Sequence, residues 1–97
     1  LDIDLRLAVD VSHLFIQRSQ GALPDRTLRR LLESPQTEEI HVSDNDGCLD
    51  LHRSIGEQTF LLDWVRERAD DLPVVLESYW HRTTPAARLD QIGLLAR

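Results

Sequence analysis

The sequence predicts an α/β fold in which short parallel strands alternate with helices in the order β-α-β-α-β-α. Three short apolar segments, residues 5–9, 39–43 and 73–76, have the length and composition of buried strands. Their ends lie about thirty residues apart along the chain, which is the size of a β-α-β unit. Such units give parallel strands joined by right-handed crossovers. We therefore expect the carboxyl ends of all three strands to meet at one edge of a sheet.

Between the first two strands, the sequence predicts a loop followed by a helix. Residues 14–22 are mixed in polarity and end near a glycine, as loops do. Pro24 and Asp25 then favour a helix start, because proline suits the first turn and an acidic side chain is stabilised at a helix N-terminus. Pro35 ends this helix. Its apolar stripe is formed by Leu28, Leu31 and Leu32.

Two further helices follow the second and third strands. One is expected over residues 59–69, after a polar loop. Its apolar face is formed by Phe60, Leu61, Trp64 and Val65. The other begins near Thr84 and Pro85, because threonine caps helix N-termini and proline is favoured at the first helical position. The apolar positions that share one face of this last helix are Leu89, Ile92 and Leu95.

Length and composition bound the classes of protein to which this chain can belong. Its 97 residues suffice for one small domain, and 41% hydrophobic with 29% charged residues is typical of a globular protein. No apolar run approaches the roughly 18 residues of a membrane span. The net charge of -6 argues against a general nucleic-acid-binding surface, which needs clustered Lys and Arg. A nucleic-acid enzyme stays open, because bound cations would offset local carboxylates.

Two details of the sequence concern location and processing. Cys48 is the single cysteine and cannot form an internal disulfide, so we expect a reducing, cytoplasmic compartment. The chain starts at Leu1 and contains no Met, so we expect it to be a processed product, a fragment or an excised domain.

Side chains that bind metals or move protons follow the ends of all three predicted strands. They are Asp10 and His13 after the first strand, His41, Asp44, Asp50 and His52 in or after the second, and Glu77 after the third. In parallel α/β folds, active sites lie at this edge of the sheet. Imidazole and carboxylate groups together are suitable ligands for zinc, manganese or iron. The sequence therefore predicts a divalent-metal site whose ion is Mn, Zn or Fe.

Each of these residues also has a purely structural explanation. Asp10 and Asp44 suit turns or helix starts, where a carboxylate accepts nearby backbone N–H groups, and His13 suits a packed loop position. His41 is harder to explain, because an imidazole in a buried strand needs a partner, and so does Glu77. For the neighbouring residues the structural explanation comes first: Asp46 and Gly47 fit an ordinary turn, His81 a solvated loop, and Tyr79 and Trp80 a pocket lining or a packed rim.

In these residues the chain resembles the xylose isomerase-like TIM-barrel superfamily, which includes sugar isomerases and epimerases and the endonuclease IV type of abasic-site nuclease. The matching motifs, in chain order, are Asp10-Val-Ser-His13, His41-Val-Ser-Asp44-Asn-Asp-Gly47, Asp50-Leu-His52, Ile55-Gly56-Glu57 and Val75-Leu-Glu77. The similarity covers nearly the whole chain but only the last three βα units of the family's eight. It implies that residues 1–97 are a partial domain, namely strands six to eight, with their helices, of a (β/α)8 barrel of about 250 residues.

The resemblance also implies roles for individual residues. Asp10, His41 and Glu77 match the metal ligands shared by the family, and Glu77 is also the candidate catalytic base. A further glutamate from the family's fourth strand completes that site, and this chain has no corresponding segment. His13 and Asp44 match substrate-binding positions, and in the nuclease the residue at the place of His13 holds a further zinc.

Asp50 and His52 match a pair that binds a third zinc in the nuclease. Many sugar isomerase-like members also carry Asp-x-His at this place, and a related branch of multinuclear iron enzymes that modify peptide cysteines has a comparable pattern. The pair therefore does not decide between these activities. Gln58 departs from the family pattern, because a glycine commonly follows Gly56-Glu57 there.

The activity that the resemblance implies is that of a divalent-metal-dependent isomerase or epimerase acting on a sugar-like or sugar-phosphate substrate, of which this chain is the C-terminal segment. Two alternatives stay open: a metal-dependent abasic-site phosphodiesterase, which the acidic charge disfavours, and a non-catalytic interaction or assembly domain. Three parallel strands leave two edges and apolar faces exposed. We therefore expect the missing barrel strands to come from the parent chain, a partner chain or self-association, and any enzyme activity to require them.

Overall fold

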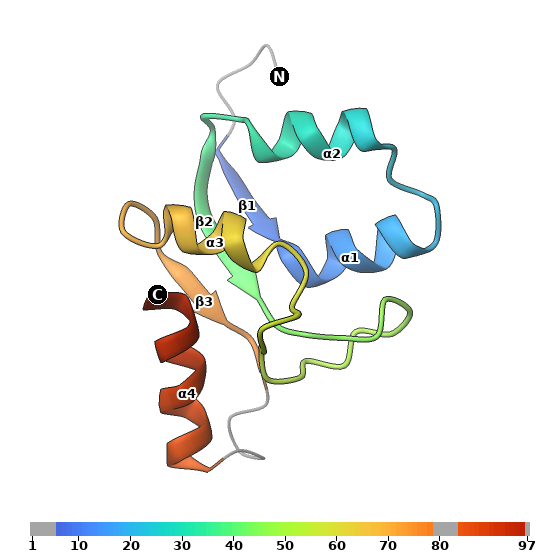
Figure 1. The fold of residues 1–97 in the computed structure, drawn as a ribbon. Helices are drawn as coiled ribbons and strands as arrows, with labels where there is room; N and C mark the ends of the chain where they lie inside the picture. The colour runs from blue at the N-terminus through green and yellow to red at the C-terminus, as the bar shows by residue number, and fades with distance from the viewer. Residues whose placement is uncertain (1–5, 79–83, 97) are drawn as a thin grey trace.

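The computed structural model describes residues 6–78 and 84–96. Its elements are β1 (Leu7–Asp10), α1 (Val11–Ser19), α2 (Asp25–Leu32), β2 (Thr37–Val42), α3 (Leu62–Arg68), β3 (Val74–Leu76) and α4 (Pro85–Ala96) (Figure 1). The chain is therefore the α/β mixture that the sequence predicts, with one additional helix. Tyr79, Trp80 and His81 lie outside the described residues. Within these two ranges, no helix has the length and apolar character needed to cross a membrane.

The three strands form one parallel sheet in the order β1-β2-β3. In its register Asp10 lies beside His41, and His41 lies beside Val75. The Glu77 N–H donates to the Val42 carbonyl at 2.9 Å, so the pairing continues beyond β3. All three strands point the same way, as predicted, and their carboxyl ends therefore gather at one edge of the sheet (Figure 1).

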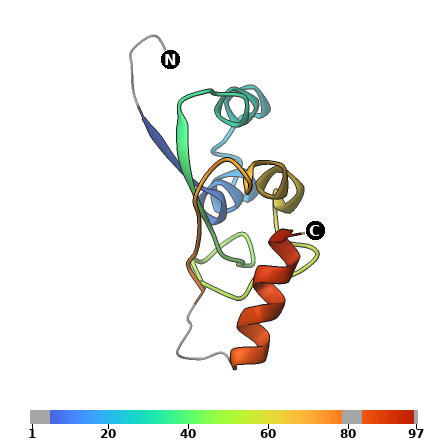
Figure 2. The same ribbon diagram turned by 90° about the vertical axis from the view of Figure 1, so that its left-hand side faces the viewer.

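The helices cover one face of this sheet (Figure 2). Side chains alternate between the two faces along a strand. In β2, Ile40 and Val42 are fully buried, while Glu39 and His41 on the opposite face are only partly buried. The core that joins the sheet to the helices also contains Val11, Ile55, Leu62, Val65 and Leu94. No described helix packs on the opposite face, where Val75 is 40% exposed.

The prediction of a loop over residues 14–22 is wrong, because α1 occupies Val11–Ser19. Asp10 caps this helix through its side chain, whose Oδ1 accepts the His13 N–H at 3.1 Å. Gly21, with φ of 75°, follows the helix end in the left-handed conformation that commonly terminates helices. The segment has mixed polarity because α1 has one buried side and one exposed side.

The remaining helices lie in the predicted segments, and two of them begin at the predicted residues. Helix α2 begins at Asp25 and α4 at Pro85, as predicted. The Thr84 hydroxyl caps α4 by accepting a backbone N–H of its first turn at 3.1 Å. Helix α3 starts only at Leu62, because Leu61 directly before it has a left-handed backbone with φ of 61°.

The buried face of α4 differs from its apolar stripe. Leu89 and Ile92 are 68% and 53% exposed. Gln91 instead is 2% exposed, and its Oε1 accepts hydrogen bonds from the Ile55 N–H and the Ser78 hydroxyl, both at 3.1 Å. A buried amide thus ties α4 to the loop after β2 and to the end of β3.

Replacing this amide tests its contribution to stability. Gln91→Ala should lower the free energy of unfolding by about 1–3 kcal/mol, because it leaves the buried Ile55 N–H without an acceptor. Urea denaturation followed by circular dichroism measures the change. Gln17→Ala, at an exposed position of α1, is the matched control and should have little effect. Equal losses of unfolding free energy in the two variants would contradict a stabilising role for the Gln91 hydrogen bonds.

Candidate functional site

Six of the side chains that the sequence predicts as site residues meet at the carboxyl edge of the sheet. This strand-end cluster consists of Asp10 and His13 from β1 and α1, His41 from β2, Asp50 and His52 from the following loop, and Glu77 from the end of β3. Each member contacts at least one other through its side chain. Parallel pairing gathers the strand ends, and the loop after β2 returns to the same edge.

His13 lies in the first turn of α1, shortly after the cap residue Asp10. Its Nε2 lies 2.8 Å from Asp50 Oδ2, and its Nδ1 lies 3.3 Å from Asp10 Oδ2. Asp10 therefore has two functions, because Oδ1 caps the helix and Oδ2 faces the imidazole. The His13 side chain is 55% exposed, so it is not a packed loop histidine. Its contacts with Asp10 and Asp50 make it a member of the cluster.

His52 reaches the cluster from the loop after β2. Its φ of 49° is uncommon outside glycine, although histidine is among the residues that adopt it more often. Its Nδ1 lies 3.0 Å from the Glu77 carbonyl oxygen, and its Nε2 lies 3.2 Å from Asp50 Oδ2. A carbonyl oxygen only accepts, so Nδ1 of His52 donates the hydrogen. Asp50 Oδ2 consequently faces an imidazole nitrogen of both His13 and His52.

His41 and Glu77 form the other part of the cluster. The Nδ1 of His41 lies 3.1 Å from Glu77 Oε1, and its Nε2 contacts Glu39 Oε1. Glu39 is not among the residues that the sequence predicts for the site. The signal for it was available, because the two-residue period of a strand places Glu39 on the same face as His41.

The ring nitrogens of the three histidines share one property. Each of the six nitrogens faces an acceptor oxygen, which belongs to a carboxylate of Asp10, Glu39, Asp50 or Glu77 or to the Glu77 carbonyl. Three neutral imidazoles carry only three hydrogens between them. Three of the six contacts are hydrogen bonds, one for each histidine, and three hydrogens suffice for them. The other three are nitrogen–carboxylate pairs of 3.1 to 3.3 Å, which a positive charge on the imidazole strengthens. The cluster is therefore built to accept positive charge.

The carboxylates raise the pKa of two histidines above the ordinary value of 6.5. The pKa of His13 is raised chiefly by the hydrogen bond to Asp50, against the opposing effect of burial. The pKa of His41 is raised chiefly by the hydrogen bond to Glu39, with a further increase from Glu77, again against burial. These ion pairs contribute their full stability below pH 6.5 and lose it as the pH rises through the folded-state pKa values.

Asp44 is placed differently from the cluster. Its backbone pairs with that of Arg53 through two hydrogen bonds of 2.9 Å, which close the loop between them. Within residues 6–78 and 84–96, the Asp44 side chain forms no ion pair with the cluster. The substrate contact expected of Asp44 stays a prediction.

The loop closed by Asp44 begins with a tight turn anchored to α1. Asn45 Nδ2 donates to a backbone carbonyl in the first turn of α1 at 3.0 Å, and its Oδ1 accepts the Gly47 N–H at 2.7 Å. Asp46 Oδ1 accepts the backbone N–H groups of Leu49 and Cys48, and these bonds lower the pKa of Asp46. The turn predicted at Asp46 and Gly47 is therefore confirmed.

The donor chemistry of the cluster fits a divalent metal, while its side chains are paired rather than gathered around one point. In the part of the chain that the structure describes, no group of three or more His, Cys, Asp or Glu side chains is arranged to hold a metal ion. The nitrogen–oxygen distances within the cluster are 2.8 to 3.3 Å. Neighbouring donors around a metal with bonds of about 2.1 Å are roughly 3.0–3.4 Å apart. The paired distances therefore resemble those between two donors of one ion, while no three of the described side chains surround one point.

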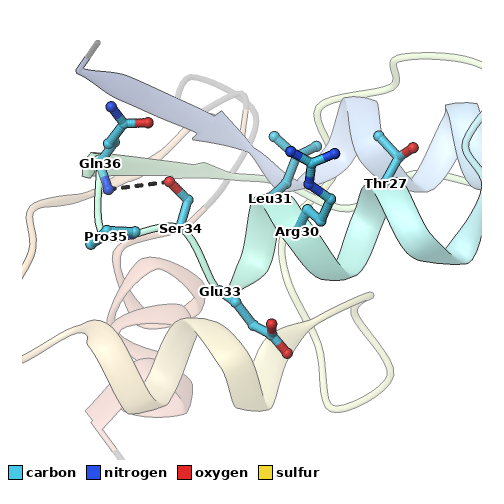
Figure 3. Close-up of a pocket in the computed structure, with 7 residues that line it drawn as sticks. All are labelled: Thr27, Arg30, Leu31, Glu33, Ser34, Pro35 and Gln36. Carbon is cyan, nitrogen blue, oxygen red and sulfur yellow. Dashed lines mark hydrogen bonds between the residues drawn. The ribbon is translucent and has the colours of Figure 1, made fainter. Parts of the chain in front are cut away.

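A cavity of about 590 Å³ lies at the opposite end of the sheet (Figure 3). Its lining residues are Thr27, Arg30, Leu31, Glu33, Ser34, Pro35 and Gln36. Gln36 directly precedes β2, and its N–H donates to the Ser34 hydroxyl at 3.2 Å (Figure 3). No member of the strand-end cluster is among these described lining residues, so the cluster is not part of this cavity.

The turn before Asp50 depends on a glycine. Gly47→Ala should lower the free energy of unfolding by roughly 1–2 kcal/mol from its φ of 84° alone, and by more because the added Cβ lies 2.6 Å from Ser19 Oγ. Gly21→Ala is the matched control, because its φ is 75° and nothing lies within 4 Å of the added Cβ. Chemical unfolding of both variants measures the difference. A Gly47 variant no less stable than the Gly21 variant would contradict the contact with Ser19.

The link between Asp50 and His13 is testable in the metal-free protein. Asp50→Asn should lower the pKa of His13, because it removes the hydrogen-bonded carboxylate that chiefly raises it. An NMR titration of the imidazole resonances measures this shift. His41 is the internal control, since its pKa is raised by Glu39 and Glu77 instead. An unchanged pKa of His13 would show that Asp50 is not its partner.

Comparison of this chain with protein-family models, curated proteins and solved structures gave no match.

Proposed function

We propose that this chain forms the last three βα units of a xylose isomerase-like barrel and that its strand-end cluster binds a divalent metal. The proposed activity is isomerisation or epimerisation of a sugar-like or sugar-phosphate substrate. Three features support it: the parallel sheet, the gathering of the predicted residues at its carboxyl edge, and the motifs that carry the family resemblance.

The observation that carries the metal proposal is the pairing of three imidazoles with carboxylates at the carboxyl edge of the sheet. His52 donates from Nδ1 to a carbonyl oxygen, so its Nε2, when neutral, presents a lone pair to a carboxylate oxygen 3.2 Å away. A cation close to both atoms is electrostatically favoured there. Imidazole and carboxylate together favour Zn, Mn or Fe over the oxygen-preferring Ca and Mg. This donor set therefore supports a site for one of these divalent ions.

Within this proposal the residues have distinct roles. Asp10, His41 and Glu77 are the primary metal ligands, and Asp50 with His52 provides a second pair. His13 and Asp44 contact the substrate, and Glu77 is also the candidate base that moves a proton. The metal, when bound, polarises a carbonyl and a hydroxyl of the substrate.

The uncovered face of the sheet supports the barrel part of the proposal. Glu39, His41 and Val75 lie on this face, to which no described helix is packed. Parallel sheets are normally covered on both faces. In a barrel this face is the interior, and further strands continue from the edges of β1 and β3. Those strands come from the parent chain, a partner chain or self-association.

An abasic-site phosphodiesterase is the second candidate, and one contact favours it. Asp50 Oδ2 faces both His13 and His52, which together provide donors for an additional metal ion. Phosphodiesterases of this type use several metal ions that act on one phosphate group. The net charge of -6 weighs against a DNA substrate. Assays of the barrel-complete protein on ketose sugars and on abasic DNA, run side by side, separate the two activities.

Metal binding itself is the first test. Isothermal titration of the metal-free chain with Zn²⁺ or Mn²⁺ should show stoichiometric binding that tightens as the pH rises, because the metal displaces protons from the histidines. His41→Ala and Glu77→Gln should each weaken binding at least about tenfold, while Asp90→Asn on the exposed side of α4 should not. Variants that bind like the wild type would contradict these ligand roles, and a folded chain that binds no metal would favour the non-catalytic assembly domain.

A further inference from the structure

Among the described residues, Glu39 is a carboxylate that contacts the cluster and that none of the proposed roles includes. It lies in β2, two residues before His41, and strand alternation places both on the uncovered face of the sheet. The intervening Ile40 is fully buried on the opposite face. The orientation of this pair is therefore fixed by the burial of apolar neighbours in the same strand.

The two nitrogens of His41 point to different surroundings. Its Nδ1 faces Glu77 Oε1 at 3.1 Å, and the Glu77 carbonyl in turn accepts from His52. Its Nε2 faces Glu39, which lies further toward the amino end of the strand. The residue paired with Glu39 in β1 is Ala8, which provides no donor, whereas His41 is paired with Asp10. Nδ1 thus faces the proposed ligand Glu77, and Nε2 faces Glu39 instead.

We infer that Glu39 is a positioning residue, which holds the hydrogen of His41 on Nε2 and thereby presents Nδ1 to the metal. This inference rests on the proposed metal function. A carboxylate that accepts the outer N–H of a metal-binding histidine fixes the ring orientation and its tautomer and makes the ring a stronger ligand. Glu39 does not bind the ion itself.

The alternative explanation for the contact is that Glu39 forms only a surface ion pair with His41, which would contribute little to stability. The two roles differ in what a neutral acceptor can replace. Glutamine retains an oxygen that accepts the Nε2 hydrogen, whereas alanine does not. A positioning residue is therefore rescued by Glu39→Gln, and a metal ligand is not, because a neutral amide is a poor ligand for these ions.

The first experiment titrates the metal-free full chain with Co²⁺. Glu39→Ala should weaken binding by about 10–100-fold, and Glu39→Gln should bind close to the wild type. Glu38→Ala is the matched control, because Glu38 is on the same strand, exposed, and paired with Arg6 at 3.3 Å. Equal losses in the alanine and glutamine variants of Glu39 would overturn the inference in favour of direct ligation. No loss in Glu39→Ala would overturn it in favour of the surface ion pair.

The second experiment reads the tautomer of His41 without metal, from the ¹⁵N shifts of its ring at a pH where the ring is neutral. The wild type and Glu39→Gln should carry the hydrogen on Nε2, and Glu39→Ala should lose this preference. An unchanged tautomer in Glu39→Ala would overturn the inference. If the wild type keeps the tautomer but binds no Co²⁺, the proposed metal function fails while the orienting contact stands. Circular dichroism melts show that each variant is folded.

Discussion

The parallel register of β1, β2 and β3 is the constraint on which the candidate site depends. It places Asp10 beside His41 and carries the pairing forward to Glu77. Because side chains alternate along a strand, a slip of one residue in β2 would turn His41 toward the helices and expose Ile40. Ile40 is fully buried, so the burial of an apolar side chain decides where the imidazole lies. The site geometry is set by the core rather than by the polar contacts.

The loop after β2 adds side chains to the site that the strands themselves do not contain. It carries Asp50 to a position between His13 and His52, and so joins the start of α1 to the end of β3. Asn45 holds one part of this loop to α1, and Gln91 holds its later part to α4. Carboxylates gathered in this way repel one another unless cations lie between them. Protonated histidines meet that need without metal, and the proposed divalent ion would take over from some of the protons.

The uncovered face of the sheet and the polarity of its residues have a common explanation in the proposed barrel. An isolated parallel sheet with one bare face leaves apolar side chains such as Val75 partly open to solvent. In a barrel the same face lies inside, where polar residues near the carboxyl edge form the active site. Leu89 and Ile92 on the outer side of α4 are then positions that a neighbouring helix would cover. The proposal therefore accounts for the polar and the apolar residues that the described elements leave uncovered.

The sequence by itself determined the strands, the starts of α2 and α4, and the residues of the strand-end cluster. Apolar runs, helix caps and turns are signals carried by neighbouring residues, so Pro85 with Thr84 was sufficient to locate a helix start. The same reasoning missed α1, because its exposed polar side masked its period. It also missed Glu39, although the two-residue period of β2 places Glu39 on the same face as His41. Only the tertiary structure decided that Asp50 meets His13 across 37 positions of the chain, and that Gln91 rather than Leu89 is buried on α4. The physical reason is that these pairings depend on which distant segments the packed core brings together, and no local pattern of residues contains that information.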